Sequence, residues 1–147
     1  MRMNPKSLLA LFGVLLLGAC DSSTAVNGDA SGTYTLQSIS GNPLPYTVGT
    51  SATTTLTFKS GSLTINTDQS FSETTDFDQT DNSTNPPTVV SGTSTCVGTY
   101  AQRGNSFTFS EASSADPSCG FTYGGSWNGT NSFTVNYAPG AAALYTK

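Results

Sequence analysis

Ser106-Phe107-Thr108-Phe109 and Ser132-Phe133-Thr134-Val135 are the two stretches that decide the fold of this 147-residue chain. In each stretch large apolar residues alternate with Ser or Thr. This period of two is typical of a strand with one buried and one wetted face. A turn rich in Gly and Asn precedes each stretch, and a shorter arm precedes each turn: Gly98-Thr99-Tyr100 and Gly125-Ser126-Trp127. The two segments therefore predict two antiparallel hairpins with aromatic side chains on their inner face.

The same alternation recurs along the rest of the chain after residue 32. It predicts further strands over 33–37, 55–58, 62–66, 71–77 and 144–145. Lys59-Ser60-Gly61 predicts a hairpin turn between the second and third of these strands, and Asp68-Gln69 predicts the next turn. Two adjacent prolines place a loop over 81–87, because both cannot take part in a strand ladder.

About eight to ten short strands joined by tight turns indicate an all-β fold. We expect an antiparallel barrel or a strongly curved sandwich over residues 32–147, and only one domain, since a chain of this length has room for no more. Closure suits this sequence, because it removes the sheet edges that a chain with so few lysines cannot protect by charge.

The first twenty residues predict export from the cytoplasm. Arg2 and Lys6 precede an apolar run over 8–17 that is too short for a permanent membrane span. The run ends in Leu17-Gly18-Ala19-Cys20, which resembles the bacterial lipobox. That resemblance implies cleavage after residue 19 and fatty acylation of Cys20. Residues 1–19 are then the signal peptide and 20–31 the lipidated cysteine with a flexible linker; the alternative is an ordinary cleaved signal with an incidental cysteine.

The expected location is the bacterial cell envelope, outside the cytoplasm, with the membrane as a partner through the lipid anchor at Cys20. Asp21 resembles a signal that keeps lipoproteins of some bacteria in the inner membrane, which favours that membrane. After residue 20 only Lys59, Arg103 and Lys147 oppose the nine acidic residues of the chain. So few cations argue against a nucleic-acid partner and against a polybasic contact with anionic lipid.

Two further segments carry a family resemblance. Gly32-Thr33-Tyr34-Thr35-Leu36-Gln37-Ser38-Ile39-Ser40-Gly41-Asn42-Pro43-Leu44-Pro45 resembles the opening of small bacterial lipoproteins described as lipocalin-like, and residues 61–71 are similar to their next hairpin. The resemblance implies a small up-and-down barrel and brings no catalytic residues. One departure is Gln69, where such hairpins usually carry Gly after the Asp, so a different turn type is expected.

Cys96 and Cys119 are the two cysteines that remain after lipidation of Cys20. In an exported protein such a pair predicts a structural disulfide, with free thiols as the alternative. The loop of about 24 residues that it closes corresponds to roughly 3 kcal/mol in the chain-entropy model. A redox-active pair is disfavoured, since the Cys-x-x-Cys spacing is missing.

The chain contains no histidine, which removes the commonest general base and most zinc sites. We therefore expect no enzyme activity and no cofactor. Glu73 and Glu111 are a glycosidase-type pair in principle only, because two glutamates in a chain of this length are weak evidence.

Five carboxylates gather in one hairpin and loop: Asp68, Glu73, Asp76, Asp78 and Asp81. Asp76 and Asp78 share a strand face, so one interpretation is a calcium site. The spacing fits no EF-hand loop, and the favoured interpretation is a solvated acidic strand end. No metal is predicted.

Aromatic residues are the candidates for a ligand cavity or its rim: Tyr34, Phe58, Tyr100, Phe107, Trp127 and Phe133. The simpler interpretation is that they fill the core, since a small barrel needs large side chains inside. The leading hypothesis is a non-enzymatic envelope module that binds a small apolar ligand or another envelope component. The alternative is a structural or protein-interaction lipoprotein with a packed interior.

Overall fold

The computed structural model describes residues 28–113, 116–138 and 141–147. The predicted signal peptide, Cys20 and Asp21 lie outside these residues. Ten strands follow one another: β1 (Gly32–Ile39), β2 (Asn42–Pro43), β3 (Tyr46–Gly49), β4 (Thr54–Ile65), β5 (Ser70–Asp81), β6 (Thr88–Arg103), β7 (Ser106–Glu111), β8 (Thr122–Trp127), β9 (Ser132–Ala138) and β10 (Ala141–Thr146).

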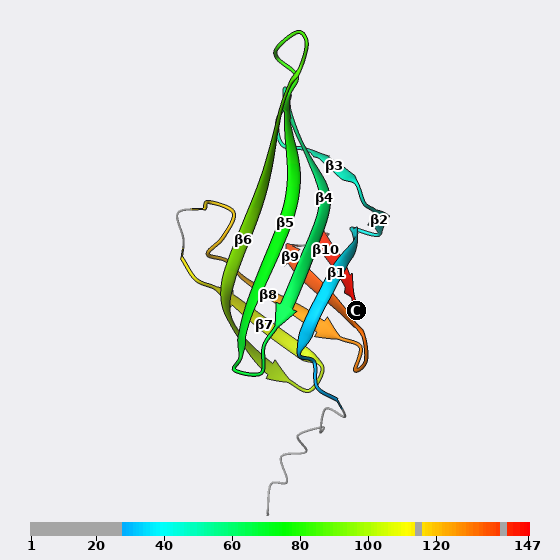
Figure 1. Ribbon diagram of the computed structural model, residues 1–147, viewed down its shortest axis with the longest axis vertical. Coiled ribbons are helices and arrows are strands. Elements are labelled where there is room, and N and C mark those ends of the chain that lie inside the picture. The colour runs from blue at the N-terminus through cyan, green and yellow to red at the C-terminus, as the bar shows by residue number, and fades with distance from the viewer. Residues whose placement is uncertain (1–27, 114–115, 139–140) are drawn as a thin grey trace, which may run out of the picture.

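Eight of these strands close into an antiparallel up-and-down barrel, which confirms the expected fold class (Figure 1). Strands β4 to β10 pair in sequence order, and β1 closes the ring by pairing with both β10 and β4. The short strands β2 and β3 flank the ring on β1 and β4. The two hairpins expected from the alternating Phe-Thr stretches are β6–β7 and β8–β9.

The prediction of a turn at Lys59-Ser60-Gly61 is wrong, because β4 runs without a break through these residues. It pairs with β5 along its length, with a bulge between Phe58 and Ser60. Gly61 is needed for close packing instead of turning: a Cβ there would lie 3.0 Å from the Thr74 carbonyl oxygen and 3.1 Å from Leu36 Cδ2. In this strand glycine marks a close approach of neighbours.

In the turn between β4 and β5, Gln69 adopts a backbone conformation that is typical of glycine. Gln69 has φ 67°, in the left-handed region that L side chains rarely adopt. Asp68 supports this turn by accepting hydrogen bonds from the backbone N–H and the hydroxyl of Ser70. The missing glycine has therefore not produced the different turn type that was expected at this site.

One end of the barrel is filled with aromatic and aliphatic side chains; we call it the packed end. Its members include Tyr34, Leu63, Ile65, Phe71, Phe107, Phe109, Trp127, Phe133 and Val135, all 5% exposed or less. Edge-to-face ring pairs join Phe133 to Tyr34 and to Phe107, with centroids 4.9 and 4.8 Å apart.

The described N-terminal residues seal this packed end. Strand β1 begins at Gly32, as expected, but Ala30 is already buried, and its carbonyl oxygen accepts a hydrogen bond of 2.6 Å from the Tyr34 hydroxyl. Lys147 Nζ donates to the Ser31 carbonyl oxygen at 2.5 Å. The first described residues, 28–31, therefore lie at this end of the barrel (Figure 1).

The opposite end is built differently. Strands β4, β5 and β6 extend well past their neighbours there, and the β5–β6 loop forms the far tip of the molecule (Figure 1). This loop, residues 82–87, lies within the predicted one and is ordered by Asp81, which accepts hydrogen bonds from the backbone N–H and hydroxyl of Ser83. In the part of the chain that the structure describes, no helix is long and apolar enough to cross a membrane.

Candidate functional site

The barrel opens at the end opposite the packed one into a cavity of about 850 Å³; we call this the hollow end. Its wall is mainly apolar. Its aliphatic and aromatic lining residues include Leu36, Ile39, Tyr46, Val48, Leu56, Phe58, Phe77, Phe121, Ala141 and Ala143. A concave, largely apolar space of this size with a few polar groups has the dimensions of a small-molecule site.

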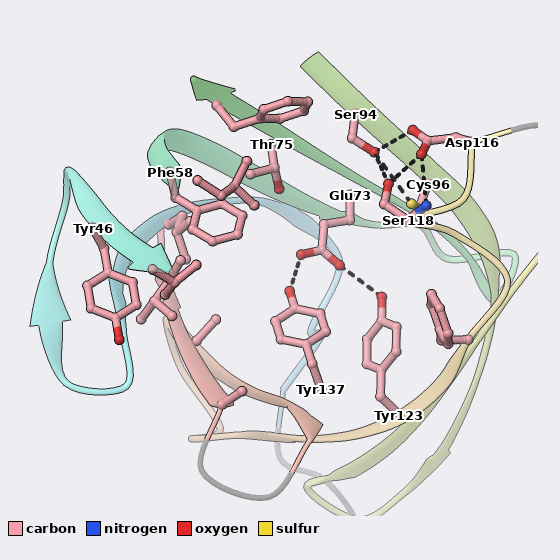
Figure 2. Close-up of a pocket in the computed structure, with 18 of the residues that line it drawn as sticks. Tyr46, Phe58, Glu73, Thr75, Ser94, Cys96, Asp116, Ser118, Tyr123 and Tyr137 are labelled. Carbon is pink, nitrogen blue, oxygen red and sulfur yellow. Dashed lines mark hydrogen bonds between the residues drawn. The ribbon is translucent and has the colours of Figure 1, made fainter. Parts of the chain in front are cut away.

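The carboxyl group of Glu73 projects from β5 into this cavity and is the centre of its polar part (Figure 2). Glu73 is only 8% exposed. Three tyrosine hydroxyls donate hydrogen bonds to it: Tyr123 to Oε2 at 2.8 Å, and Tyr137 and Tyr145 to Oε1. The hydroxyls of Tyr137 and Tyr145 also lie 2.9 Å from each other.

Strand alternation places these four side chains. Glu73 is two residues after the buried Phe71, so it faces inward. Tyr137 continues the inward series of Phe133 and Val135 on β9 in the same way. The adjacent strands β8, β9 and β10 bring the three tyrosines together, and Glu73 meets their hydroxyls across the barrel interior from β5. Glu73 therefore lies where the packed core ends and the cavity begins.

Burial raises the pKa of the Glu73 carboxyl above its usual value, and the charge of nearby Glu111 adds to this rise. The three tyrosine hydroxyls act in the opposite direction, because they donate to the ionised form. Burial also raises the pKa of Tyr123, Tyr137 and Tyr145, and the negative charge of Glu73 raises each of them further. A negative charge on Glu73 therefore costs free energy, and a positive group placed beside it would lower that cost.

A disulfide joins Cys96 to Cys119, as predicted, and ties β6 to the segment between β7 and β8. This segment borders the cavity through Asp116, Pro117 and Ser118. The Ser94 hydroxyl donates to Asp116 Oδ2 at 2.7 Å, so a side-chain hydrogen bond holds the same segment to β6 (Figure 2). The cross-link therefore shapes one wall of the cavity.

The disulfide also decides against a metal at this wall. Cys96, Glu111 and Cys119 bring their ligand-type atoms within 4.8 Å of one another. However, the two sulfurs are bonded to each other and neither is available as a thiolate. What remains there is the Glu111 carboxylate, whose Oε2 accepts a hydrogen bond from the Phe121 backbone N–H at 3.0 Å.

Of the six aromatic residues expected at a cavity or its rim, only Phe58 lines the cavity. Tyr34, Phe107, Trp127 and Phe133 are buried in the packed end, and Tyr100 packs against them from the side. These five follow the simpler interpretation, that of core filling. The aromatic residues that do line the cavity include Tyr46, Phe77, Phe121, Tyr123, Tyr137 and Tyr145.

The carboxylates that suggested a calcium site are separated by the pleat of β5. Asp76 and Asp78 face outward and are held by neighbouring side chains: Asp76 by the hydroxyls of Ser60 and Thr93, Asp78 by Lys59 at 2.7 Å. Glu73 faces inward. Asp68 lies in the β4–β5 turn and Asp81 at the other end of β5, so the five carboxylates do not converge on one point.

Sequence reasoning missed Glu73 and its three tyrosines as one site. The signal was present in the spacing, since Glu73 follows Phe71 by two residues and Tyr137 follows Val135 by two. The register between the strands decides that these residues lie at the same height in the barrel, and the sequence pattern did not predict that register. Comparison with known proteins adds nothing to this site, because no family model, curated protein or solved structure matches the chain.

Proposed function

We propose that this protein is a lipid-anchored binding module of the bacterial cell envelope that holds a small, mainly apolar ligand in the hollow end of its barrel. The observation that carries the proposal is the cavity of about 850 Å³ with a mainly apolar wall. A small barrel whose inner side chains only served stability would be filled along its whole length. The cavity therefore weighs against the structural alternative, which requires a packed interior.

The ligand is tested by extracting the full chain from membranes in polymer nanodiscs without detergent and analysing bound small molecules by mass spectrometry. The variant that should block the cavity is Thr75→Phe, which adds a ring on the inner face of β5 at the cavity wall. We expect one class of small molecule to co-purify with the wild type and to be reduced in Thr75→Phe. A second variant, Thr74→Phe, puts the same ring on the other face of β5 and should retain the molecule. Equal small-molecule content in all three proteins would contradict the proposal.

The anchor is the second part of the proposal. It rests on the lipobox-like ending at Cys20 and on the place where the described chain begins. Because Ala30 is buried at the packed end, an acylated residue ten positions earlier would attach the barrel by that end. The cavity mouth would then point away from the bilayer, towards soluble ligands of the envelope.

Metabolic labelling with radioactive palmitate tests the anchor. We expect the wild type to be labelled and Cys20→Ser to be unlabelled. Sucrose-gradient fractionation of the labelled cells tests the membrane, for which Asp21 favours the inner one. A wild type that takes up no palmitate would remove the anchor from the proposal and leave the cavity untouched.

A second candidate is acid–base hydrolysis, favoured by one observation: Glu73 and Glu111 both line the cavity, and the pKa of Glu73 is raised. Against it, three tyrosine hydroxyls already occupy the Glu73 oxygens, which leaves this group little freedom to act on a substrate. A panel of chromogenic glycosides distinguishes the two functions. We expect no turnover; turnover that Glu73→Gln abolishes would establish the hydrolase.

A further inference from the structure

We propose that the ligand of this cavity carries a protonated amine, which pairs with the Glu73 carboxylate on the cavity floor while the apolar body of the ligand fills the space above. This inference rests on the proposed function, because it specifies the chemistry of the molecule bound in that same cavity.

The charges on the cavity wall are all of one sign. Glu73, Glu111 and Asp116 line it, and no Lys or Arg among the described residues does. The three cations of the described chain lie elsewhere. Lys59 pairs with Asp78 on the outer face, Arg103 ends β6 at the packed end, and Lys147 lies against Ser31. An anionic ligand would meet three carboxylates and no cationic side chain of the described residues, so the cavity selects against fatty acids and other anions.

The hydrogen bonds around Glu73 leave acceptors for a cation and no donors for an anion. The three tyrosine protons all point to the carboxylate. Two carboxylate oxygens offer about four lone-pair positions, so one remains for a ligand donor. The hydroxyl oxygens of Tyr123 and Tyr137 also keep lone pairs that can accept. A primary ammonium group has three N–H donors and matches this set.

The surroundings of Glu73 strengthen such a pair. Glu73 is 8% exposed as a residue and lies where the packed core begins, so a charge pair there is little screened by water. Tyr123 and Tyr137 point their hydroxyls at this carboxyl (Figure 2), so the two hydroxyl oxygens would lie beside a bound ammonium group and could accept from it. Above this level the wall is apolar, with Phe58, Phe77 and Leu56 facing the space that a hydrocarbon body would occupy.

Isothermal titration calorimetry with three matched probes tests the proposal: n-octylamine, 1-octanol and octanoate, each titrated at neutral pH into the full chain in nanodiscs. We expect octylamine to bind at least about tenfold tighter than octanol, because a hydrogen bond to a charged partner is stronger than a neutral one. Octanoate should bind most weakly. This order is measured on the wild type and needs no variant to fold.

Two variants assign the preference to Glu73. Glu73→Gln keeps the shape of the side chain and removes its charge, and should bring octylamine to within a few-fold of octanol. Asp78→Asn removes one charge from the outer face of the same strand and is the matched control; it should keep the preference. An octanol or octanoate affinity equal to that of octylamine, or an unchanged preference in Glu73→Gln, would overturn the amine inference and leave the binding function standing. Absence of binding for all three probes would overturn both.

Discussion

The packed end and the hollow end of this barrel are continuous along the same strands, yet one is solid and the other encloses space. On β5 the change occurs between two inward-facing neighbours, Phe71 at 2% exposure in the core and Glu73 at the cavity floor. The strand pattern is the same on both sides of this step. Alternation therefore decides which residues face inward, whereas the size of the facing side chains decides whether the interior is filled.

The largest expected difference between the two ends is the cost of removing an aromatic ring. Phe133→Ala at the packed end deletes a fully buried ring that contacts Tyr34 and Phe107, and should lower the free energy of unfolding by about 3–5 kcal/mol. Phe58→Ala at the hollow end removes a ring that already borders open space. It should cost about 1 kcal/mol, since it creates little new cavity in a packed region. Urea unfolding of both variants measures this, and equal losses would contradict the comparison.

The disulfide is the main cross-link of the hollow end and ranks next. Replacing both cysteines, Cys96→Ser with Cys119→Ser, should lower the free energy of unfolding by about 3 kcal/mol, because the unfolded chain regains the freedom of the loop. Reduced wild-type protein should unfold at the same urea concentration as this double variant. Affinity for the octyl probes should fall as well, since the tied segment borders the cavity. A double variant as stable as the oxidised wild type would show that the hollow end does not depend on this bond.

The buried carboxyl at the hollow end makes stability depend on pH. Since the pKa of Glu73 is raised in the folded state, folding takes up a proton above the ordinary pKa of 4.5. The free energy of unfolding should therefore decrease as the pH rises from about 4.5 towards the folded-state pKa, by no more than about 1.4 kcal/mol per pH unit. Glu73→Gln should remove this decrease.

The outer aspartates provide the internal control for that measurement. Hydrogen bonds from neighbouring hydroxyls and from Lys59 lower the pKa values of Asp76 and Asp78, so their contribution to stability is present above 3.8 and is lost as the pH falls below it. This loss at low pH should persist in Glu73→Gln. If the free energy of unfolding of Glu73→Gln still decreased above pH 4.5, a group other than Glu73 would be the cause.

The smallest expected effect is a gain at the packed end. Gln69 has φ 67° in the β4–β5 turn, and Gln69→Gly would relieve this strain. We expect a stabilisation of about 1 kcal/mol, because the left-handed conformation costs a residue with a Cβ about that much. Gln69→Val, with its branched Cβ, should be less stable than the wild type. Thermal unfolding monitored by circular dichroism measures both variants.

Much of this barrel was predictable because its information is local. The Ser/Thr and aromatic alternation over 106–109 and 132–135 predicted β7 and β9, and the glycine- and asparagine-containing segments before them predicted the turns. The pairing of Cys96 with Cys119 was predictable because only two cysteines follow residue 20. The turn at Lys59-Ser60-Gly61 failed for the same local reason: Gly61 serves the packing of Leu36 from another strand, which no short window of sequence contains.

The site was less predictable because it depends on register between strands. Glu73, Tyr123, Tyr137 and Tyr145 come from four strands and meet only when the barrel closes. Asp76 and Asp78 lie closer to Glu73 in sequence, yet the pleat of β5 sends them to the opposite face. Because alternate residues of a strand face the same side, Phe71 and Phe133 predict that Glu73 and Tyr137 also face inward. The alternation does not predict that these two side chains lie at the same level of the barrel.

The start of β1 and the end of β10 lie next to each other, with Thr35 opposite Thr146 and the Lys147 ammonium on the Ser31 carbonyl oxygen. A fluorescent protein or affinity tag joined after Lys147 would therefore leave the barrel beside its own beginning. The mouth at the far end of the strands would stay unobstructed, so ligand exchange can be followed on a tagged protein in living cells.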